Sequence, residues 1–132
     1  ELAKKYPDQV AVIIAYNEQW AREIYAACDF LIMPSRFEPC GLNQLYSMRY
    51  GTVPIVSNVG GLKDTVPDIS RKGNGIVSES IDQKGFTESI KRAAELYKNK
   101  KRLAPLINKM TKLDYSWSHS AKEYAKMYSQ LS

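Results

Sequence analysis

The sequence predicts an α/β protein with a parallel sheet of about four strands and flanking helices. Short apolar runs at 10–15, 30–33, 53–57 and 75–78 have the length and composition of strands that are buried on both faces. Segments with helical spacing of apolar residues lie between and after these runs. Strands that alternate with helices favour parallel βαβ units, and 132 residues suffice for one domain.

The first helix between two of these strands is expected to begin after Asn17, because asparagine often caps helices by accepting a backbone N–H. Its inward face is expected to comprise Trp20, Ala21, Ile24, Ala27 and Cys28. The next strand, 30–33, ends before Pro34.

A second helix is expected from about residue 41 or 42 to Tyr50, and Gly51 supplies a left-handed stop. Its inward residues are expected to be Leu42, Leu45 and Tyr46. Strand 53–57 follows, with its proline near the start, where a missing N–H is tolerated.

The remainder of the chain is expected to be mostly helical. Gly60-Gly61 makes a turn into a short segment that ends near Val66, and a short strand follows at 75–78. A helix is then predicted by the spacing of Phe86, Ile90, Ala93, Ala94 and Tyr97. Another is predicted by Leu103, Leu106, Ile107 and Met110, with Pro105 in its first turn or bending it. A last helix, capped by Ser116, carries Trp117, Ala121, Tyr124, Ala125, Tyr128 and Leu131.

Composition and charge exclude several classes of protein. Hydrophobic residues make up 44% and charged residues 25% of the chain, no apolar run is long enough to span a bilayer, and no signal peptide is recognisable. We therefore expect a cytoplasmic protein without a membrane partner, with Cys28 and Cys40 as reduced thiols. Two cysteines and one histidine do not make an ordinary structural zinc site, and we expect no metal. The basic stretch 91–112 has helical spacing and no aromatic platform, which favours a solvated helix face over nucleic-acid binding.

Two loops that follow strands carry the candidate site. In open parallel sheets, ligands bind beyond the carboxyl ends of the strands, where Ser35–Cys40 and Asn58–Gly61 are expected to lie. Gly41 precedes a helix N-terminus, which favours an anion, and Gly60-Gly61 can form a second group of N–H donors. Two such loops suit a phosphorylated ligand, and a nearby carboxylate, Glu38, suits a sugar.

Ordinary structural roles compete with these interpretations. Glycines after strands are common turn residues, and an isolated Glu38 is more often a solvated loop acid. Cys40 is more often a small packed side chain than a reactive thiol. By spacing alone, Tyr16 and Tyr46 are ordinary core or edge aromatics.

Several motifs resemble those of bacterial glycogen synthases and plant starch synthases. The resemblance covers nearly the whole chain. It rests on Phe37-Glu-Pro-Cys-Gly-Leu42, Gln44-Leu-Tyr46, Tyr50-Gly51, Gly60-Gly-Leu62, Tyr16-Asn-Glu18 and Tyr115-Ser-Trp117. It implies a GT-B glycosyltransferase fold with two Rossmann-like domains. It also implies retaining transfer of glucose from ADP-glucose to the 4-hydroxyl at the non-reducing end of an α-1,4-glucan, with no cofactor besides the nucleotide sugar.

The resemblance also implies roles for individual residues. Glu38 would be the catalytic-site acid that hydrogen-bonds the donor glucose. The backbone of Cys40, Gly41 and Leu42 would approach the glucose and diphosphate, Asn43 would lie by the phosphates, and Tyr16 would stack on adenine. Gly60 and Gly61 would belong to the second glycine loop of the site.

This sequence departs from the family pattern at three positions. Tyr46 stands where the wider superfamily has a second glutamate associated with ribose, so the ribose contacts stay open. Asn43 stands where threonine is frequent, and either residue can donate to a phosphate. The second glycine loop begins with Asn58-Val59 in place of Lys-Thr, so it contributes no lysine.

The family's N-terminal domain, and the βαβ unit that carries diphosphate-binding Arg and Lys, have no counterpart in these 132 residues. We therefore expect residues 1–132 to be a partial C-terminal nucleotide-sugar-binding domain that is inactive by itself. Strand 10–15 would either pair with strand 30–33 or leave a sheet edge through which chains self-associate. The alternatives are another retaining GT-B transferase with a different donor, or a non-catalytic nucleotide- or glucan-binding module.

Overall fold

The computed structural model describes residues 1–131 and contains a three-stranded parallel sheet with flanking helices, which confirms the α/β class. The strands are β1 (Phe30–Met33), β2 (Val53–Ser57) and β3 (Ile76–Ser78), in the order β1-β2-β3. Ile55 pairs with Ile32 on one side and with Ile76 on the other. All five residues of β2 are buried, so both of its faces are covered.

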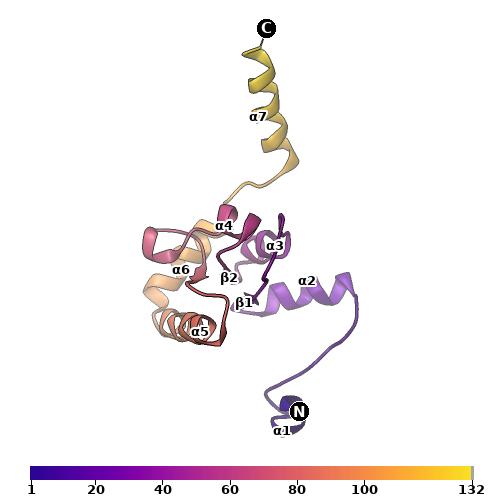
Figure 1. The fold of residues 1–132 in the computed structure, drawn as a ribbon, viewed down its shortest axis with the longest axis vertical. Helices are drawn as coiled ribbons and strands as arrows, with labels where there is room; N and C mark the ends of the chain where they lie inside the picture. The colour runs from indigo at the N-terminus through magenta and orange to yellow at the C-terminus, as the bar shows by residue number, and fades with distance from the viewer. Residues whose placement is uncertain (132) are drawn as a thin grey trace.

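The sheet has one strand fewer than the sequence predicted. Residues 10–15 form no strand, and Ile14 is 95% exposed. In Figure 1 this segment runs as an extended connection between α1 (Leu2–Lys5) and α2 (Glu18–Ala27), away from β1. An apolar run becomes a strand only where a neighbouring strand pairs with its backbone, and this segment has no such neighbour among residues 1–131.

Helix α3 (Asn43–Tyr50) packs against β1 and β2, and α5 (Gln83–Lys98) packs against β3 and β2. The predicted helix ends are confirmed at two positions. Asn17 accepts a hydrogen bond from the Trp20 N–H at the start of α2, and Gly51 ends α3 with φ 87°.

The predicted inward faces of α2 and α3 are mostly wrong, although Leu45 of α3 packs against the core as expected. Only Tyr25 of α2 is buried, and Trp20 and Ile24 are exposed. In α3, the expected inward residues Leu42 and Tyr46 are at least half exposed. The buried residues of that helix are instead Gln44, Ser47 and Met48. Periodicity alone selected the wrong stripe because two polar side chains of α3 find hydrogen bonds inside the protein.

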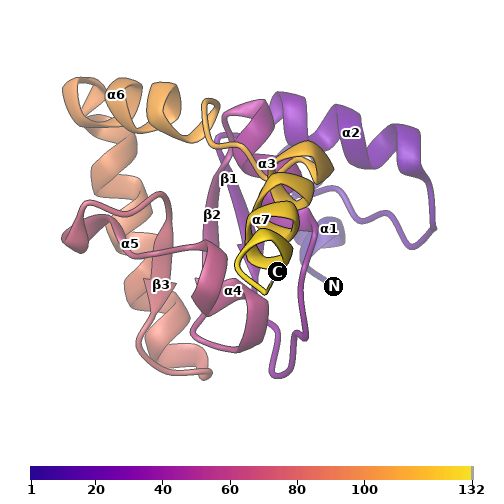
Figure 2. The same cartoon turned by 90° about the horizontal axis from the view of Figure 1, so that it is seen from above.

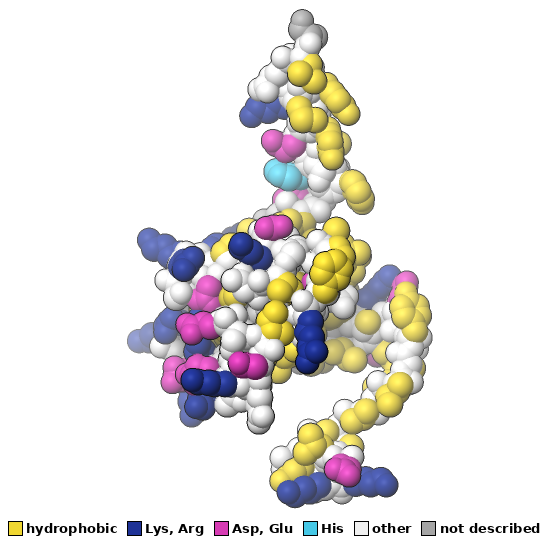
Figure 3. All heavy atoms as spheres, in the orientation of Figure 1, with side chains coloured by type: hydrophobic (Ala, Val, Ile, Leu, Met, Phe, Trp, Pro, Cys, Tyr) yellow, Lys and Arg dark blue, Asp and Glu magenta, His cyan; other side chains and the backbone are white. Residues whose placement is uncertain are grey.

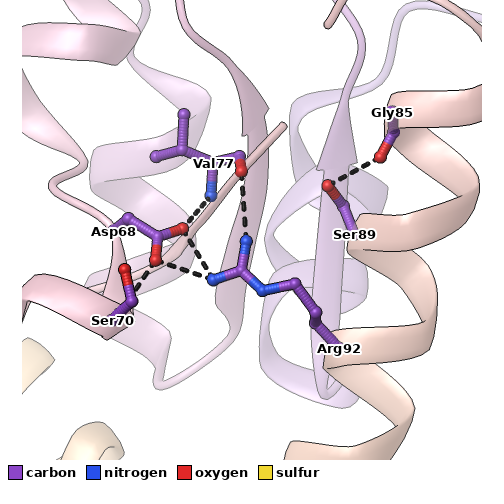
Figure 4. A network of polar contacts seen from close by, with 6 residues as sticks. All are labelled: Asp68, Ser70, Val77, Gly85, Ser89 and Arg92. Atoms are coloured by element: carbon purple, nitrogen blue, oxygen red, sulfur yellow. Dashed lines mark hydrogen bonds and ion pairs between the residues drawn. The ribbon is translucent and has the colours of Figure 1, made fainter. Parts of the chain in front are cut away.

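The connection from β2 to β3 consists of α4 (Gly60–Thr65) and a 3₁₀ turn, η1 (Ile69–Arg71). Asp68, which precedes η1, ties this connection to α5, because its carboxylate accepts two hydrogen bonds from Arg92 Nη2, at 2.7 and 2.9 Å (Figure 4). The Val77 N–H also donates to Asp68, at 2.8 Å. These contacts hold β3 against α5.

Helix α6 (Lys100–Met110) buries Leu103 and Met110, and it contains Pro105 in its interior. Helix α7 (Trp117–Ser129) begins at the predicted cap, Ser116, but buries no residue. Figure 1 shows α7 projecting beyond the sheet and its flanking helices, and Figure 2 shows the molecule from above with α7 in front. Its apolar side chains form a yellow stripe in Figure 3. None of the helices in the described part of the chain is long and apolar enough to cross a membrane.

Candidate functional site

The two predicted loops meet at the carboxyl edge of the sheet. Residues 34–42 follow β1, and residues 58–59 lead from β2 into α4. The Gly61 N–H donates a hydrogen bond of 3.1 Å to the Glu38 carbonyl, so the loops are joined directly. The structure therefore brings together five of the predicted site residues, namely Glu38, Cys40, Gly41, Gly60 and Gly61.

Gly60 and Gly61 are explained by this close approach. A Cβ atom on Gly60 would overlap the Glu38 carbonyl oxygen, and one on Gly61 would overlap the Cys40 carbonyl oxygen. Gly60 also has φ 42°, a conformation that favours glycine. The sequence led us to expect the Gly61 N–H to be free for a ligand, whereas the structure uses it between the loops.

The side chains of the first loop remain available. Glu38 is partly buried, and its Oε2 accepts a hydrogen bond of 3.3 Å from Ser35 Oγ. Its Oε1 has no partner among residues 1–131. Cys40 is exposed, and Cys28 and Cys40 are both free thiols, as predicted. A positioned carboxylate with an open oxygen can accept hydrogen bonds from a polyhydroxyl ligand.

The start of α3 presents unpaired N–H groups. Gly41 has φ 69°, and Leu42 follows in the right-handed helical region with φ −116° and ψ −26°. This succession turns consecutive N–H groups toward one side. The N–H groups of Gly41 and Leu42 have no acceptor among the described residues. Such donors at a helix N-terminus favour an anion.

A cleft of about 650 Å³ lies between α2 and α3, and Tyr16 and Asn43 both line it. The Tyr16 ring is 92% exposed, and its hydroxyl donates to Glu18 Oε1 at 3.2 Å. Arg22 is the cation in the lining. The other predicted site residues, Glu38 and the glycines included, do not line this cleft.

Three further tyrosines, which the sequence did not single out as a group, form a wall of the same cleft. The ring centroid of Tyr25 lies 6.3 Å from those of both Tyr46 and Tyr50. Burial, and to a lesser degree the Tyr46 hydroxyl, raise the pKa of Tyr25 above its ordinary value. The Tyr25 hydroxyl therefore stays protonated, and the cleft offers flat aromatic surface with hydroxyl groups at its edges.

Sequence reasoning gave no role to Gln44 or Thr65. Gln44 is fully buried, and its Nε2 donates to the carbonyls of Cys40 and Gly41 and to Thr65 Oγ1. The available signal was a polar pair, Gln44 and Ser47, spaced to share one helix face with Met48. No group of three or more His, Cys, Asp and Glu residues in the described part of the chain is arranged to hold a metal ion.

The chain is similar in sequence to known glycogen synthases. The chain is 48% identical over 120 residues to the glycogen synthase of Aquifex aeolicus, covering 91% of this chain and 26% of that protein. It is 43% identical over 131 residues to the glycogen synthase of Fervidobacterium nodosum, covering 97% and 27%. The chain thus spans about a quarter of the length of these relatives.

The fold is also found in solved structures. The catalytic domain of starch synthase IV from Arabidopsis thaliana, bound to ADP and acarbose, superposes with a TM-score of 0.86 at 36% identity. That match covers 98% of this chain and 28% of the other. The sucrose-phosphate synthase of Thermosynechococcus elongatus superposes with a TM-score of 0.71 at 25% identity, covering 98% and 32%. The sheet and its helices are therefore the C-terminal part of a GT-B fold.

Residues 2–110 match the sequence family described as glycosyl transferases group 1, which is most of the chain. The chain therefore belongs to the glycosyl transferases group 1 family.

Proposed function

We propose that this chain forms the donor-binding part of a glycogen or starch synthase, which transfers glucose from ADP-glucose to the non-reducing end of an α-1,4-glucan with retention. The observation that supports the proposal is the pair of joined loops, the first of which carries both Glu38 and the unpaired N–H groups of Gly41 and Leu42. The similarity to a starch synthase bound to ADP supports the choice of nucleotide.

The site residues have complementary roles in this proposal. The bond between the anomeric carbon and the diphosphate oxygen breaks, a bond to the acceptor oxygen forms on the same face of the sugar, and the proton of the acceptor hydroxyl passes to the departing diphosphate. The N–H groups of Gly41 and Leu42, with the Asn43 side chain, stabilise charge on the departing diphosphate. Glu38 orients the glucosyl ring as it develops oxocarbenium character.

The nucleoside lies in the cleft between α2 and α3. The exposed Tyr16 ring stacks on the base, and the wall formed by Tyr25, Tyr46 and Tyr50 contacts the ribose side. Arg22, the cation in this lining, pairs with Glu18 at 3.4 Å, so further neutralisation of the diphosphate is assigned to other parts of the complete protein. No cofactor besides the nucleotide sugar takes part.

The experiment that tests this proposal replaces Glu38 in the complete protein. Glu38→Ala should lower kcat for glucosyl transfer from ADP-glucose to glycogen by about 10²-fold, the scale for removing a well-placed polar contact in a transition state. Glu88→Ala, an exposed glutamate of α5 paired with Lys91, is the control and should retain activity. Wild-type turnover by Glu38→Ala would refute the assignment.

The similarity to a sucrose-phosphate synthase favours one second candidate, a retaining transferase with a different nucleotide-sugar donor. A donor screen with the complete protein distinguishes the two. Faster transfer from ADP-glucose than from UDP-glucose supports the synthase, and the reverse order supports the alternative.

We also infer that the outer edge of β1 makes a contact between copies of the 132-residue chain. Within residues 1–131 no strand pairs with this edge, and the apolar run 10–15 leaves it uncovered. Unpaired strand edges are templates for strand pairing with another chain.

A further inference from the structure

We propose that Gln44 and Thr65 are positioning residues that set the direction of the phosphate-facing N–H groups at the start of α3. The activity test of this proposal rests on the proposed function. Its structural test depends only on the hydrogen bonds. We call the connected set Gln44, Thr65 and the carbonyls of Cys40, Gly41 and Gly61 the Gln44–Thr65 relay.

The first part of the relay is the amide of Gln44, the second residue of α3. Its Nε2 lies 3.2 Å from the Cys40 carbonyl oxygen, 2.9 Å from that of Gly41 and 3.1 Å from Thr65 Oγ1. Its two N–H bonds are thus shared among three oxygens. Gln44 Oε1 is buried and has no partner among the described residues, so this amide serves as a donor. Burying an amide costs free energy unless its polar atoms are hydrogen-bonded. Gln44 is fully buried, and its N–H groups hold the loop by donating hydrogen bonds to it.

The direction of the loop N–H groups follows from these bonds. The peptide bonds of the described chain are trans, so the C=O of one residue and the N–H of the next point in opposite directions. Gln44 draws the carbonyls of Cys40 and Gly41 toward itself. The N–H groups of Gly41 and Leu42 must therefore point away from Gln44, and neither of them has an acceptor among the described residues.

The second part of the relay is the hydroxyl of Thr65, the last residue of α4. This hydroxyl accepts a hydrogen bond from the Gln44 amide and donates one of 2.5 Å to the Gly61 carbonyl. Thr65 thereby connects the first loop to the glycine loop, in addition to the direct bond between Gly61 and Glu38. This hydroxyl is therefore a second connection between the two loops.

The relay also contacts the segment before α7, through the backbone carbonyl of Thr65. The Thr65 carbonyl accepts hydrogen bonds from Asn74 Nδ2 at 3.1 Å and from the Tyr115 hydroxyl at 3.2 Å. These bonds fix the end of α4 and therefore the orientation of the Thr65 hydroxyl. Through Thr65 and Gln44, Tyr115 is thus connected to the carbonyls of Cys40 and Gly41, whose peptide bonds carry the N–H groups that face the donor.

The test in the complete protein is a double-mutant cycle on glucosyl transfer. Gln44→Met keeps the size of the side chain and removes its donors, and Thr65→Val removes only the hydroxyl. We expect Gln44→Met to lower kcat/KM by about 10- to 100-fold, since a displacement of about 1 Å costs up to about 10²-fold. We expect about tenfold for Thr65→Val and little further loss in the double variant, because residues that share one interaction are not additive.

Two variants separate positioning from general loss of stability. Thr65→Ser keeps the hydroxyl and should restore activity to within about threefold of wild type. Thr111→Val removes a hydroxyl that likewise donates to the carbonyl four residues earlier, at 3.1 Å, but contacts neither loop. It should retain wild-type activity and combine additively with Gln44→Met. Additive losses for Gln44 and Thr65, or equal damage in Thr65→Ser and Thr65→Val, would overturn the proposal.

A structural readout does not depend on activity. Amide hydrogen exchange should show the Gly61 N–H exchanging about tenfold faster or more in Gln44→Met and Thr65→Val, and unchanged in Thr111→Val. If the wild-type protein transfers no glucose, the proposed function fails and this measurement still decides the relay. Unchanged Gly61 exchange in both relay variants would overturn it. If Gln44→Met does not fold, the comparison of Thr65→Val with Thr65→Ser decides the question.

Discussion

Asp68 shows how one carboxylate stabilises the β3 side of the sheet. Burial by itself raises the pKa of Asp68, but hydrogen bonds from the Arg92 guanidinium and from the N–H groups of Val77 and Ser70 outweigh it. The pKa of this carboxyl is therefore held at about 2, below its ordinary 3.8. The same bonds join the segment before η1 to α5, as Figure 4 shows.

The prediction for Asp68 concerns stability and pH. A depressed pKa stabilises the folded state fully above the unfolded pKa, and this contribution is lost as pH falls through the folded pKa. Asp68→Asn should lower the free energy of unfolding by about 2 kcal/mol at pH 6. The difference from wild type should shrink from about pH 4 to about pH 2, as the wild-type carboxyl is protonated.

Chemical denaturation across this pH range measures the effect. Glu88→Gln, which alters an exposed pair with Lys91, is the control and should change stability little. A gap between wild type and Asp68→Asn that stays constant down to pH 2 would contradict the account.

At the scale of elements, the strands and the helix ends followed from local patterns. The runs 30–33 and 53–57 are β1 and β2, and Asn17, Gly51 and Ser116 end or begin helices as expected. These features depend on neighbours within a few residues, so the sequence contains them. Residues 10–15 have an equally apolar pattern but lack a pairing strand, which only the tertiary arrangement reveals.

The sequence pointed to the two loops that meet in the structure, but not to the contacts between them. The sequence pointed to Gly60 and Gly61 as donors to a ligand, whereas the structure shows that their missing side chains admit the Glu38 and Cys40 carbonyls. Gln44 was hidden because its partners include Thr65, 21 residues away in the chain. Hydrophobic periodicity does not describe a buried amide whose acceptors come from another element.

The prediction at this scale concerns Gly61. Gly61→Ala places a Cβ on the Cys40 carbonyl, so the loops must separate, and we expect a loss of about 1–3 kcal/mol in the free energy of unfolding. In the complete protein, affinity for ADP should fall as well, because the N–H groups at α3 move with the first loop. Thermal unfolding and calorimetric titration with ADP measure the two effects.

Gly51→Ala is the matched comparison. Gly51 has φ 87° at the end of α3 remote from the loops, so alanine there should cost about 1 kcal/mol in stability. Its affinity for ADP should stay at the wild-type value. Equal affinities for Gly61→Ala and Gly51→Ala would show that the close packing of the loops does not matter for binding.

At the scale of the whole molecule, the buried core contrasts with helix α7, whose apolar side chains are exposed. The buried cluster is formed by the sheet with α3, α4, α5 and α6, and includes Ile55, Leu62 and Met110. In contrast, α7 buries nothing and exposes Trp117 at 88% and Tyr128 at 64%. A helix of 13 residues is only marginally stable in water unless it packs against other residues. The stability of α7 therefore depends on packing against a surface outside residues 117–129.

The last prediction concerns association of the 132-residue chain. Ile32 is 45% exposed in β1, whose outer edge is unpaired within residues 1–131. We expect the mass of the chain to exceed that of a monomer and to rise with concentration in sedimentation experiments.

A charge on a strand edge opposes edge-to-edge pairing, so Ile32→Lys should shift the mass toward the monomer. Ile90→Lys alters an isoleucine that is 46% exposed on α5 and should leave association unchanged. If Ile32→Lys and Ile90→Lys lowered the mass equally, this would mean that the exposed apolar side chains, rather than the β1 edge, hold the copies together. A wild-type monomer at every concentration would mean that the edge stays unpaired in solution.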